Sequence, residues 1–264
     1  MKFAVLASGS SGNCIYLEMA GRHILVDAGI SNRAIGKQLS SLDIDKRQID
    51  SVLLTHEHVD HIRGVDVFAR HQPHVKVYAN PLTWRAGNKF LHRVINHQRQ
   101  HIRTQTSFAI GRVQVTPFAV SHDAADPVGY KFEAEGQCMV IATDLGTISH
   151  DVYQHLLNVD ALVIESNHDR HMLQKGPYPY FLKQRIAGNK GHLPNDITAD
   201  ILTKVICRRT QAVVLAHLSD KNNTPEIAIK ASEQTLCAAG LRPYKDFILK
   251  TANRSYAMPL IELI

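Results

Sequence analysis

A cluster of imidazoles and carboxylates directly behind an apolar run is the strongest constraint on how this chain folds. Residues 53–64 read LLTHEHVDHIRG, with three histidines and two acids inside six residues. Titratable groups that a fold crowds together lose hydration, so they need partners. A metal ion is a partner that both residue types accept. We therefore expect the strand predicted over residues 51–55 to end at a metal site.

The spacing within the cluster predicts two neighbouring ions. His56 and His58 are two residues apart, so in an extended segment their side chains point to the same side and can bind one ion. Asp60 and His61 follow where the chain turns into a predicted helix, and they can face a second ion. Two ions about 3.5 to 4 Å apart need more ligands than this segment contains. The remaining ligands must come from elsewhere in the chain.

Three later residues have the expected local setting, because each follows a predicted strand. They are His122, Asp144 and His217. An earlier segment, HILVDAG, resembles MVIATDLG around Asp144, and it places Asp27 where a strand meets a loop. A turn stabilised by an aspartate side chain is the structural alternative for each acid taken singly. Together with the histidine cluster, these positions are candidates for one site.

The order of apolar and amphipathic segments predicts an α/β fold. Strands are expected at residues 2–7, 14–20, 23–29, 51–55, 75–80, 113–120, 129–135, 138–144, 160–166, 212–218, 246–251 and 255–264. Helices are expected at residues 31–42, 60–71, 81–97, 150–158, 195–210 and 225–240. Ser31 is a predicted N-cap, and Pro225 and Gly240 suit the start and stop of the last helix.

The net charge of +6 is unevenly distributed. Residues 67–122 hold eight Lys or Arg and no acid, and residues 170–195 hold five with no acid. A solvated surface with chance clustering explains one such segment, whereas two favour an anionic substrate such as nucleic-acid phosphates. Trp84 and Phe90 are the large aromatics between residues 80 and 106, so we expect phosphate contacts there without base reading. Leu91, Val94 and Ile95 would face inward if that arm covers a sheet.

The lengths of the apolar runs and the spacing of the cysteines indicate in which compartment to expect the protein. No uncharged apolar run approaches the roughly 18 residues of a membrane span, and the N-terminal apolar run is shorter than that of a signal peptide. We expect a cytoplasmic protein without membrane contact and without an obligate protein partner. The cysteines form no CxxC pair and are expected to be buried free thiols. They are Cys14, Cys138, Cys207 and Cys237.

The motif THEHVDH, with Asp27 before it and His122, Asp144 and His217 after it, resembles the metallo-β-lactamase superfamily across almost the whole chain. The segments LASGSSGNCIYLE, VSHDAADPVGY, VIESNHDRHML and GPYPYFLKQRIAGNKGHLPN resemble its bacterial WalJ/YycJ-type members, which are regarded as 5′-to-3′ DNA exonucleases. The resemblance implies an αββα sandwich, with two mixed β-sheets flanked by helices. It also implies a single domain over residues 1–264 that binds nucleic acid, expected to be DNA, mainly through phosphates.

The resemblance also implies a role for each site residue. His56, His58 and His122 would hold the first ion, Asp60, His61 and His217 the second, and Asp144 would bridge them. Asp27 would orient a ligand through a hydrogen bond rather than bind metal. Imidazole and carboxylate ligands without cysteine suit Zn²⁺, Mn²⁺ or Fe²⁺, so the identity of the two divalent ions stays open. A hydroxide between the ions would attack the scissile phosphate.

Three further side chains have predicted roles near the reaction. Asp60 is expected to take part in catalysis through the second ion. His192, in the GHLPN segment, resembles the element with which related nucleases contact the phosphate, and it could protonate the leaving group. His168 could reach the same site or could simply pack. Glu57 should point away from its histidine neighbours and act as a capping residue or as a partner of a ligand.

Other functions use similar residues. A dinuclear hydrolase of thioesters or lactones, as in glyoxalase II, shares the ligands, although the basic segments and GHLPN argue against it. A non-catalytic, metal-stabilised nucleic-acid-binding module would bind metal without turnover, but Asp60 beside His61 is unusual for a closed structural site. A redox di-iron centre is disfavoured, because relatives of that kind commonly have an acid in place of the second histidine of HxH, and this chain has His58 there. Preference for DNA or RNA, direction of digestion and oligomeric state are left open.

Overall fold

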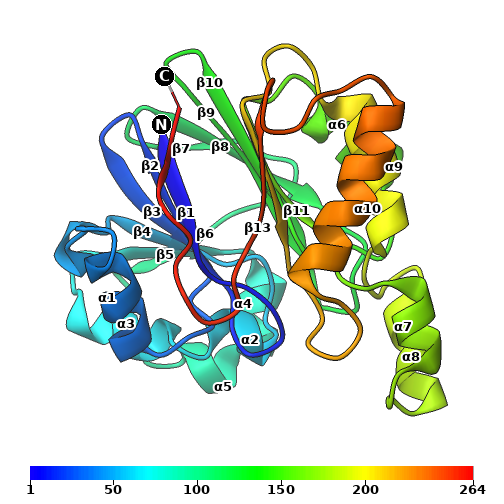
Figure 1. Ribbon diagram of the computed structural model, residues 1–264. Helices are drawn as coiled ribbons and strands as arrows, with labels where there is room; N and C mark the ends of the chain where they lie inside the picture. The colour runs from blue at the N-terminus through cyan, green and yellow to red at the C-terminus, as the bar shows by residue number, and fades with distance from the viewer. Residues whose placement is uncertain (264) are drawn as a thin grey trace.

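The strands form two seven-stranded sheets that pack face to face, as the computed structural model of residues 1–263 shows (Figure 1). In spatial order, the first sheet consists of β14 (Ile261–Glu262), β1 (Lys2–Ala7), β2 (Cys14–Met19), β3 (Arg22–Val26), β4 (Ser51–Leu53), β5 (Lys76–Ala79) and β6 (Arg99–His101). The second consists of β13 (Ile248–Thr251), β12 (Ala212–Ala216), β11 (Ala161–Glu165), β10 (Gln137–Ala142), β9 (Val128–Ala134), β8 (Val113–Ala119) and β7 (Phe108–Ile110).

Both sheets are mixed in the same way. In the first, β1, β2 and β3 pair antiparallel, and β3 to β6 pair parallel. In the second, β7 to β10 pair antiparallel, and β10 to β13 pair parallel. The carboxyl ends of parallel strands meet at one edge of each sheet, so residues at those ends become neighbours. The predicted sandwich of two mixed sheets is confirmed.

Helices cover the outer face of each sheet (Figure 1). Those on the side of the first sheet are α1 (Asn32–Ser40), α2 (Val59–Ile62), α3 (Val65–His71), α4 (Pro81–Ala86) and α5 (Asn88–Leu91), with a short 3₁₀ turn at Lys46–Gln48. Those on the second sheet are α6 (His150–Leu156), α9 (Asn195–Val205) and α10 (Pro225–Ala238). The pair α7 (Arg170–Lys175) and α8 (Tyr180–Ala187) lies apart, below α9 and α10 in the view.

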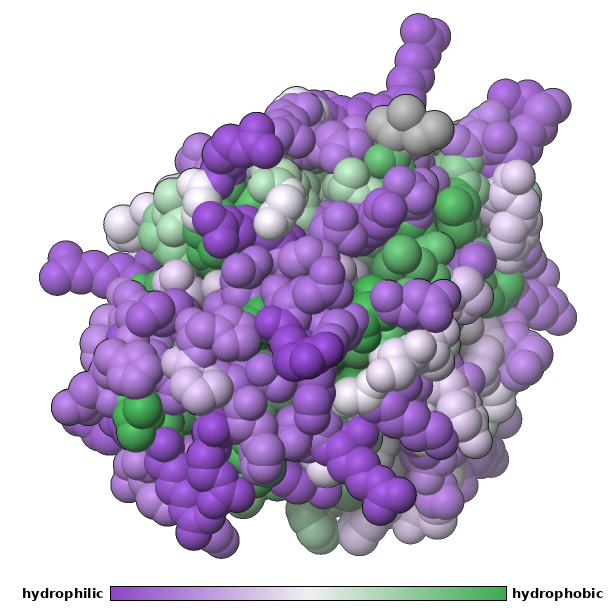
Figure 2. Space-filling view, turned by 90° about the vertical axis from the view of Figure 1, so that its left-hand side faces the viewer, coloured by the Kyte–Doolittle hydropathy of each residue, from purple (hydrophilic) through white to green (hydrophobic). Residues whose placement is uncertain are grey.

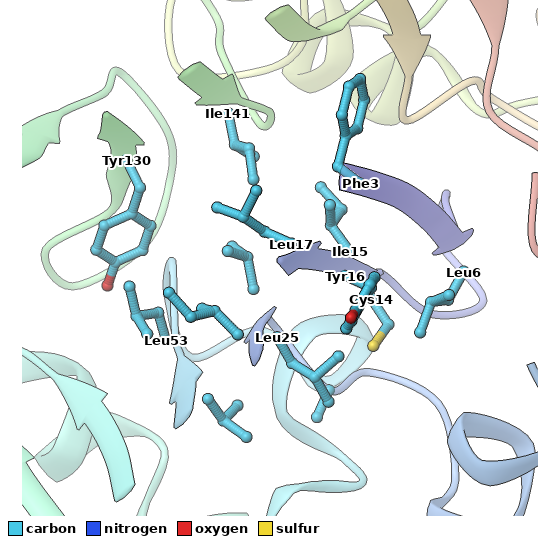
Figure 3. Close-up of a cluster of buried hydrophobic side chains, with 14 of the residues drawn as sticks. Phe3, Leu6, Cys14, Ile15, Tyr16, Leu17, Leu25, Leu53, Tyr130 and Ile141 are labelled. Atoms are coloured by element: carbon cyan, nitrogen blue, oxygen red, sulfur yellow. The ribbon is translucent and has the colours of Figure 1, made fainter. Parts of the chain in front are cut away.

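Apolar side chains from the inner faces of both sheets fill the central layer. Leu17 of β2 and Ile141 of β10 point toward one another across it, and both are fully buried (Figure 3). One polar bond also crosses the sandwich, because the buried Tyr130 hydroxyl of β9 donates to the Leu54 carbonyl at 2.7 Å. Leu54 precedes the histidine cluster, so this bond connects the second sheet to the loop that carries the cluster.

The local predictions failed where segments are short or polar. The helix expected at residues 81–97 is divided at Gly87 into α4 and α5 and ends at Leu91. Leu91 and Val94 are buried as expected, but Ile95 is 51% exposed because no helix continues to turn it inward. The polar β6, the short β7 and the weakly amphipathic α7 and α8 were not predicted. Residue 264, the last of the final predicted strand, lies outside the described residues.

The cysteine prediction holds in part. All four are free thiols, and Cys14 and Cys138 are buried. Cys207 is half-buried, and Cys237 is exposed near the end of α10, so burial was the wrong expectation for Cys237. The reason is local, since the buried residues of that helix are Ala228, Ser232 and Leu236, which line a different side.

Across residues 1–263, helices are either too short or too polar to traverse a bilayer. The face seen in Figure 2, which is the left-hand side of Figure 1, is covered mainly by hydrophilic residues, and apolar residues show between them mostly in its upper part.

Candidate metal centre

The predicted ligands come together where the parallel strands of the two sheets end. Asp27 follows β3, Asp144 lies two residues beyond β10, and His217 follows β12. These three residues have positive φ angles of 62°, 59° and 54°. Asp and His tolerate the left-handed region better than most side chains, and such backbone often occurs at functional sites. The strand exits thus turn sharply and direct polar side chains toward one point.

The histidines of the HxH element contact His122 from the opposite sheet. His58 is the N-cap residue of α2, and its Nδ1 lies 3.2 Å from His122 Nε2. Candidate ligand atoms of His56, His58 and His122 all lie within 4.8 Å of one another. This is the trio that the sequence assigns to the first ion.

The second predicted trio also forms a compact group. Candidate ligand atoms of Asp60, His61 and His217 lie within 4.8 Å of one another. His61 Nε2 is 3.6 Å from Asp60 Oδ2, and His217 Nε2 is 3.8 Å from the same oxygen. Asp60 stands in the first turn of α2, which begins at Val59. The turn from strand to helix places Asp60 and His61 as the spacing predicted.

Asp144 lies between the two trios. One carboxylate oxygen, Oδ2, is 3.3 Å from His61 Nε2, and the other, Oδ1, is 3.8 Å from His122 Nε2. Oδ1 is also 3.4 Å from His217 Nδ1, so the carboxylate contacts members of both trios, as a bridging ligand would. Its assignment as a bridge stays a prediction, as do the other ligand roles.

Most of the histidine rings are held through Nδ1, so that Nε2 is directed at the centre. Thr55 Oγ1 contacts His56 Nδ1 at 3.0 Å, and the Gly191 carbonyl contacts His122 Nδ1 at 3.2 Å. Asp27 holds His61 Nδ1 at 2.7 Å. Such an anchoring bond fixes the tautomer and ring orientation of a metal-ligating histidine. In each of these three rings Nε2 is the nitrogen left for a metal.

Buried polar atoms without hydrogen-bond partners provide a test of the fit to metal. Such atoms are expensive in a folded protein unless a ligand satisfies them. His56 Nε2, Asp144 Oδ2 and His217 Nε2 are buried and without partners, and all three belong to the two trios and their bridge. The donors are imidazole nitrogen and carboxylate oxygen, a set that divalent transition metals accept. The residues present therefore fit divalent ions.

The electrostatics of the centre divide the histidines into two kinds. Burial lowers the pKa of His56 and also that of His122, so both rings stay neutral. Burial also opposes the charging of His61, but the carboxylates of Asp144 and Asp27 outweigh it and raise its pKa to about 9. The same balance, with Asp144, Asp60 and Glu165 as the acids, raises the pKa of His217. The acids thus favour protonated histidines in the second trio. A bound cation would replace those protons.

Asp27 contacts one of the predicted ligands and the residue before the histidine cluster, and its supporting role stays a prediction. Its Oδ1 accepts the Thr55 backbone N–H at 2.8 Å, and its Oδ2 accepts the Thr55 hydroxyl at 2.8 Å, in addition to contacting His61. Both oxygens are therefore engaged by protein groups. The carboxylate thus orients two neighbours of the centre, Thr55 and His61.

Glu165 is a site residue that the sequence prediction missed. It ends β11, is fully buried, and its Oε1 contacts His217 Nδ1 at 2.8 Å and His192 Nδ1 at 2.7 Å. Its Oε2 accepts the Leu145 backbone N–H at 2.7 Å. The histidine contacts outweigh burial and lower its pKa, so it stays ionised. A carboxylate inside the apolar strand ALVIE was the available signal, because a buried acid needs such partners.

His192 lies at the edge of the centre. Its Nδ1 is bonded to Glu165 and is 3.9 Å from Asp144 Oδ1, and its side chain keeps 17% exposure. His168 is close by but buried, with a β-bridge to Pro194 and an unpartnered Nδ1. Burial lowers the pKa of His168 to about 4. No contact joins His168 to the ligand trios among residues 1–263.

Two loops complete the walls of the centre. Glu57 points away from the histidines, and its Oε1 accepts the Ala125 N–H at 2.8 Å, which supports the loop after His122. Asn13 is the last residue of the GSSGN loop at residues 9–13, and the contact of its side chain with the centre was not predicted. Its amide nitrogen is 2.9 Å from His61 Nε2 and 3.3 Å from Asp60 Oδ2. The loop can lie this close because Gly29 has no side chain. A Cβ on Gly29 would be 1.6 Å from the Asp60 carbonyl oxygen and 2.8 Å from the Asn13 nitrogen.

The two basic segments differ in how they relate to the centre. In the first, the Arg99 guanidinium donates to the Val94 and Leu91 carbonyls and stacks over the buried Trp84. In the second, Arg185 of α8 pairs with Asp123, the neighbour of His122, at 2.5 Å. The first segment thus uses part of its charge to hold its own fold, whereas the second borders the site.

Comparison with known proteins agrees with this arrangement. A family model described as the beta-lactamase superfamily domain matches residues 22–218. The exodeoxyribonuclease WalJ of Streptococcus pneumoniae serotype 2 (strain D39 / NCTC 7466) is 37% identical over 264 residues, which cover 99% of this chain and 98% of that protein. The exodeoxyribonuclease YycJ of Bacillus anthracis is 36% identical, with 89% of each chain covered.

A solved structure, Zn²⁺-bound PqqB from Methylobacterium extorquens, matches with a TM-score of 0.70 at 18% identity, covering 98% of this chain and 99% of that one. At that identity the likeness concerns the fold. With the family match and the two relatives, the chain belongs to the metallo-β-lactamase superfamily. Within it, the chain groups with the WalJ/YycJ-type proteins.

Proposed function

We propose that this protein is a metal-dependent 5′-to-3′ DNA exonuclease that hydrolyses phosphodiester bonds at a two-ion centre. The observation that carries the proposal is His192, held by Glu165 at 2.7 Å beside the predicted bridging carboxylate. The names of the two relatives, both exodeoxyribonucleases, support the substrate class. When bound, two divalent ions lower the pKa of a water and neutralise charge on the phosphoryl oxygens.

The protein's own groups position the reaction around those ions. Glu165 accepts the Nδ1 proton of His192, so Nε2 is the nitrogen available to a substrate. In its protonated form His192 can donate a proton to the leaving oxygen as the P–O bond breaks. Asp60 would help to hold the second ion, and Asp27 and Thr55 orient the rings. His168 is assigned a supporting rather than a catalytic role, because its ring is buried and it belongs to neither ligand trio.

The basic segment around α8 supports an anionic substrate bound through phosphates. Arg185 and Asp123 form an ion pair directly beside His122, so that segment can guide a strand toward the ions. We further propose Zn²⁺ or Mn²⁺ as the physiological metal, with Fe²⁺ as the alternative, a single functional domain over residues 1–264, and a cytoplasmic location without an obligate protein partner.

The test is metal analysis of the purified protein together with digestion of 5′- and 3′-labelled DNA, single- and double-stranded, and of a thioester. We expect release of labelled mononucleotides from the 5′ end and no thioester hydrolysis. His58→Ala should lose both metal and cleavage, whereas His192→Ala should keep its metal and lose rate. His171→Ala, an exposed histidine on α7, is the matched control. Thioester turnover without DNA cleavage would instead support a glyoxalase II-like enzyme.

A further inference from the structure

Two adjoining cavities extend from His192 toward the helices α7 and α8. The first, of 460 Å³, is lined by residues that include His192, Gly146, Asn189 and His168. The second, also of 460 Å³, lies between α7 and α8 and is lined by His168, Arg170, Leu173, Gln174, Tyr180, Lys183, Gln184 and Ala187. His168, Arg170 and Ala187 belong to both walls. The two cavities thus lie side by side between the edge of the metal centre and the α7–α8 pair.

The lining of the second cavity has the composition of a nucleotide site. Leu173, Ala187 and the Tyr180 ring provide apolar surface, while Gln174 and Gln184 provide amides. Arg170 and Lys183 provide positive charge at the rim. Each uses one donor already, Arg170 to Asp196 and Lys183 to the Gln174 carbonyl, and each retains further N–H groups. A volume of 460 Å³ falls within the range of about 300 to 1,000 Å³ for small-ligand sites, so it suits one nucleotide rather than a duplex.

Two observations separate this cavity from an ordinary surface hollow. His168, which forms the wall between the cavities, is 1% exposed, and its buried Nδ1 lacks a partner. Tyr180 and Phe181, at the start of α8, are 75% and 72% exposed. Exposed aromatic rings among cations are the arrangement on which single-stranded bases stack, independently of base identity. The Tyr180 hydroxyl accepts a bond from the Gln184 amide at 2.8 Å, which holds the ring at the cavity.

We propose that the α7–α8 cavity binds the terminal nucleotide of a DNA strand, with its base stacked on Tyr180 and its phosphate near Arg170 and Lys183. This inference rests on the proposed function and adds the substrate subsite. In the proposed reaction a bond forms between phosphorus and the water oxygen, the P–O3′ bond breaks, and O3′ takes a proton from His192. The nucleotide that carries O3′ lies on the His192 side, where the cavities begin. A terminal nucleotide that extends through both cavities, with its O3′ at the His192 side and its base at Tyr180, accounts for release of one nucleotide at a chain end.

The inference can be tested by binding, with chelator present so that no cleavage occurs. The probe is a single-stranded oligodeoxynucleotide with 2-aminopurine as its 5′-terminal base, whose fluorescence falls when the base stacks. We expect strong quenching by the wild-type protein and by Tyr180→Phe, and little by Tyr180→Ala. Tyr244→Ala, which removes another exposed tyrosine near α10, should behave as wild type. Quenching that is equal for a terminal and an internal 2-aminopurine would overturn the proposal.

Kinetics with metal present provide the second readout. Tyr180→Ala should raise KM about tenfold with little change in kcat, the size expected for loss of one stacked base. A substrate whose terminal nucleotide is abasic should show the same increase with the wild-type enzyme, and Tyr180→Ala should then cause no further loss. If the increases in KM caused by Tyr180→Ala and by the abasic terminal nucleotide were additive, the inference would be contradicted. If wild-type protein quenches the terminal base but cuts no DNA, the subsite stands and the proposed nuclease activity fails.

Discussion

The two halves of the metal centre are built in different ways. The half from the first sheet lies in one short segment, because His56, His58, Asp60 and His61 follow β4 directly and enter α2. The half from the second sheet takes one residue from each of several strand exits, with His122, Asp144, Glu165 and His217 far apart in the chain. The first half can be recognised by spacing, whereas the second depends on parallel strands that end at the same edge.

Loss of a ligand from either half is expected to have the largest effect. His56→Ala and His217→Ala should each lower metal occupancy and reduce DNA cleavage by about 10³-fold or more, because the ions provide several kcal/mol of charge stabilisation. Metal analysis beside the cleavage assay measures both effects. If one of these two variants keeps full metal occupancy and full rate while the other loses both, the centre is confined to a single sheet.

The supporting carboxylates should have intermediate effects that differ between the halves. Asp27 contacts one predicted ligand, whereas Glu165 contacts a predicted ligand and the proposed acid His192. Removing such an orienting group typically costs about 10- to 100-fold in metal affinity or activity. Asp27→Asn should weaken Zn²⁺ binding and regain its rate at saturating metal, while Glu165→Gln should remain slow. Competition with a chromophoric chelator and kcat at several Zn²⁺ concentrations distinguish them. Identical behaviour would remove the proposed link from Glu165 to His192.

One methyl group added at Gly29 should break the close contact between the GSSGN loop and the THEHVDH motif. Gly29→Ala places a Cβ 1.6 Å from the Asp60 carbonyl oxygen, so the backbone must shift, and overpacking of this kind costs about 1 to 3 kcal/mol or more. Gly36→Ala, inside α1, meets the flexible Lys46 side chain at 3.4 Å and should stabilise by about 0.5 to 1 kcal/mol. Thermal unfolding of both variants measures the contrast. Equal unfolding temperatures would mean that the loop is not packed as described.

The smallest expected effect concerns the two basic segments. Lys190, exposed beside the Gly191 that contacts His122, should bind a phosphate, so Lys190→Ala should weaken DNA binding and reduce the slope of log K against log salt by about 1. Arg93→Ala, in the exposed part of the first segment, should leave that slope unchanged. Fluorescence anisotropy at several salt concentrations decides between them. The opposite result would place the DNA path over α4 and α5.

The sequence alone predicted an α/β fold and, from spacing, the four candidate ligands that follow β4, because periodicity and spacing are local properties. The sandwich of two sheets and the roles of the other candidate ligands were implied by the resemblance to metallo-β-lactamases, and the ligand roles stay predictions. The sequence did not identify Glu165, Asn13 or the cavity between α7 and α8. Their roles come from contacts between residues up to 52 positions apart, as in the bond from Glu165 to His217. A single buried acid in an apolar strand has many possible partners, and packing of the two sheets decides which of them it meets.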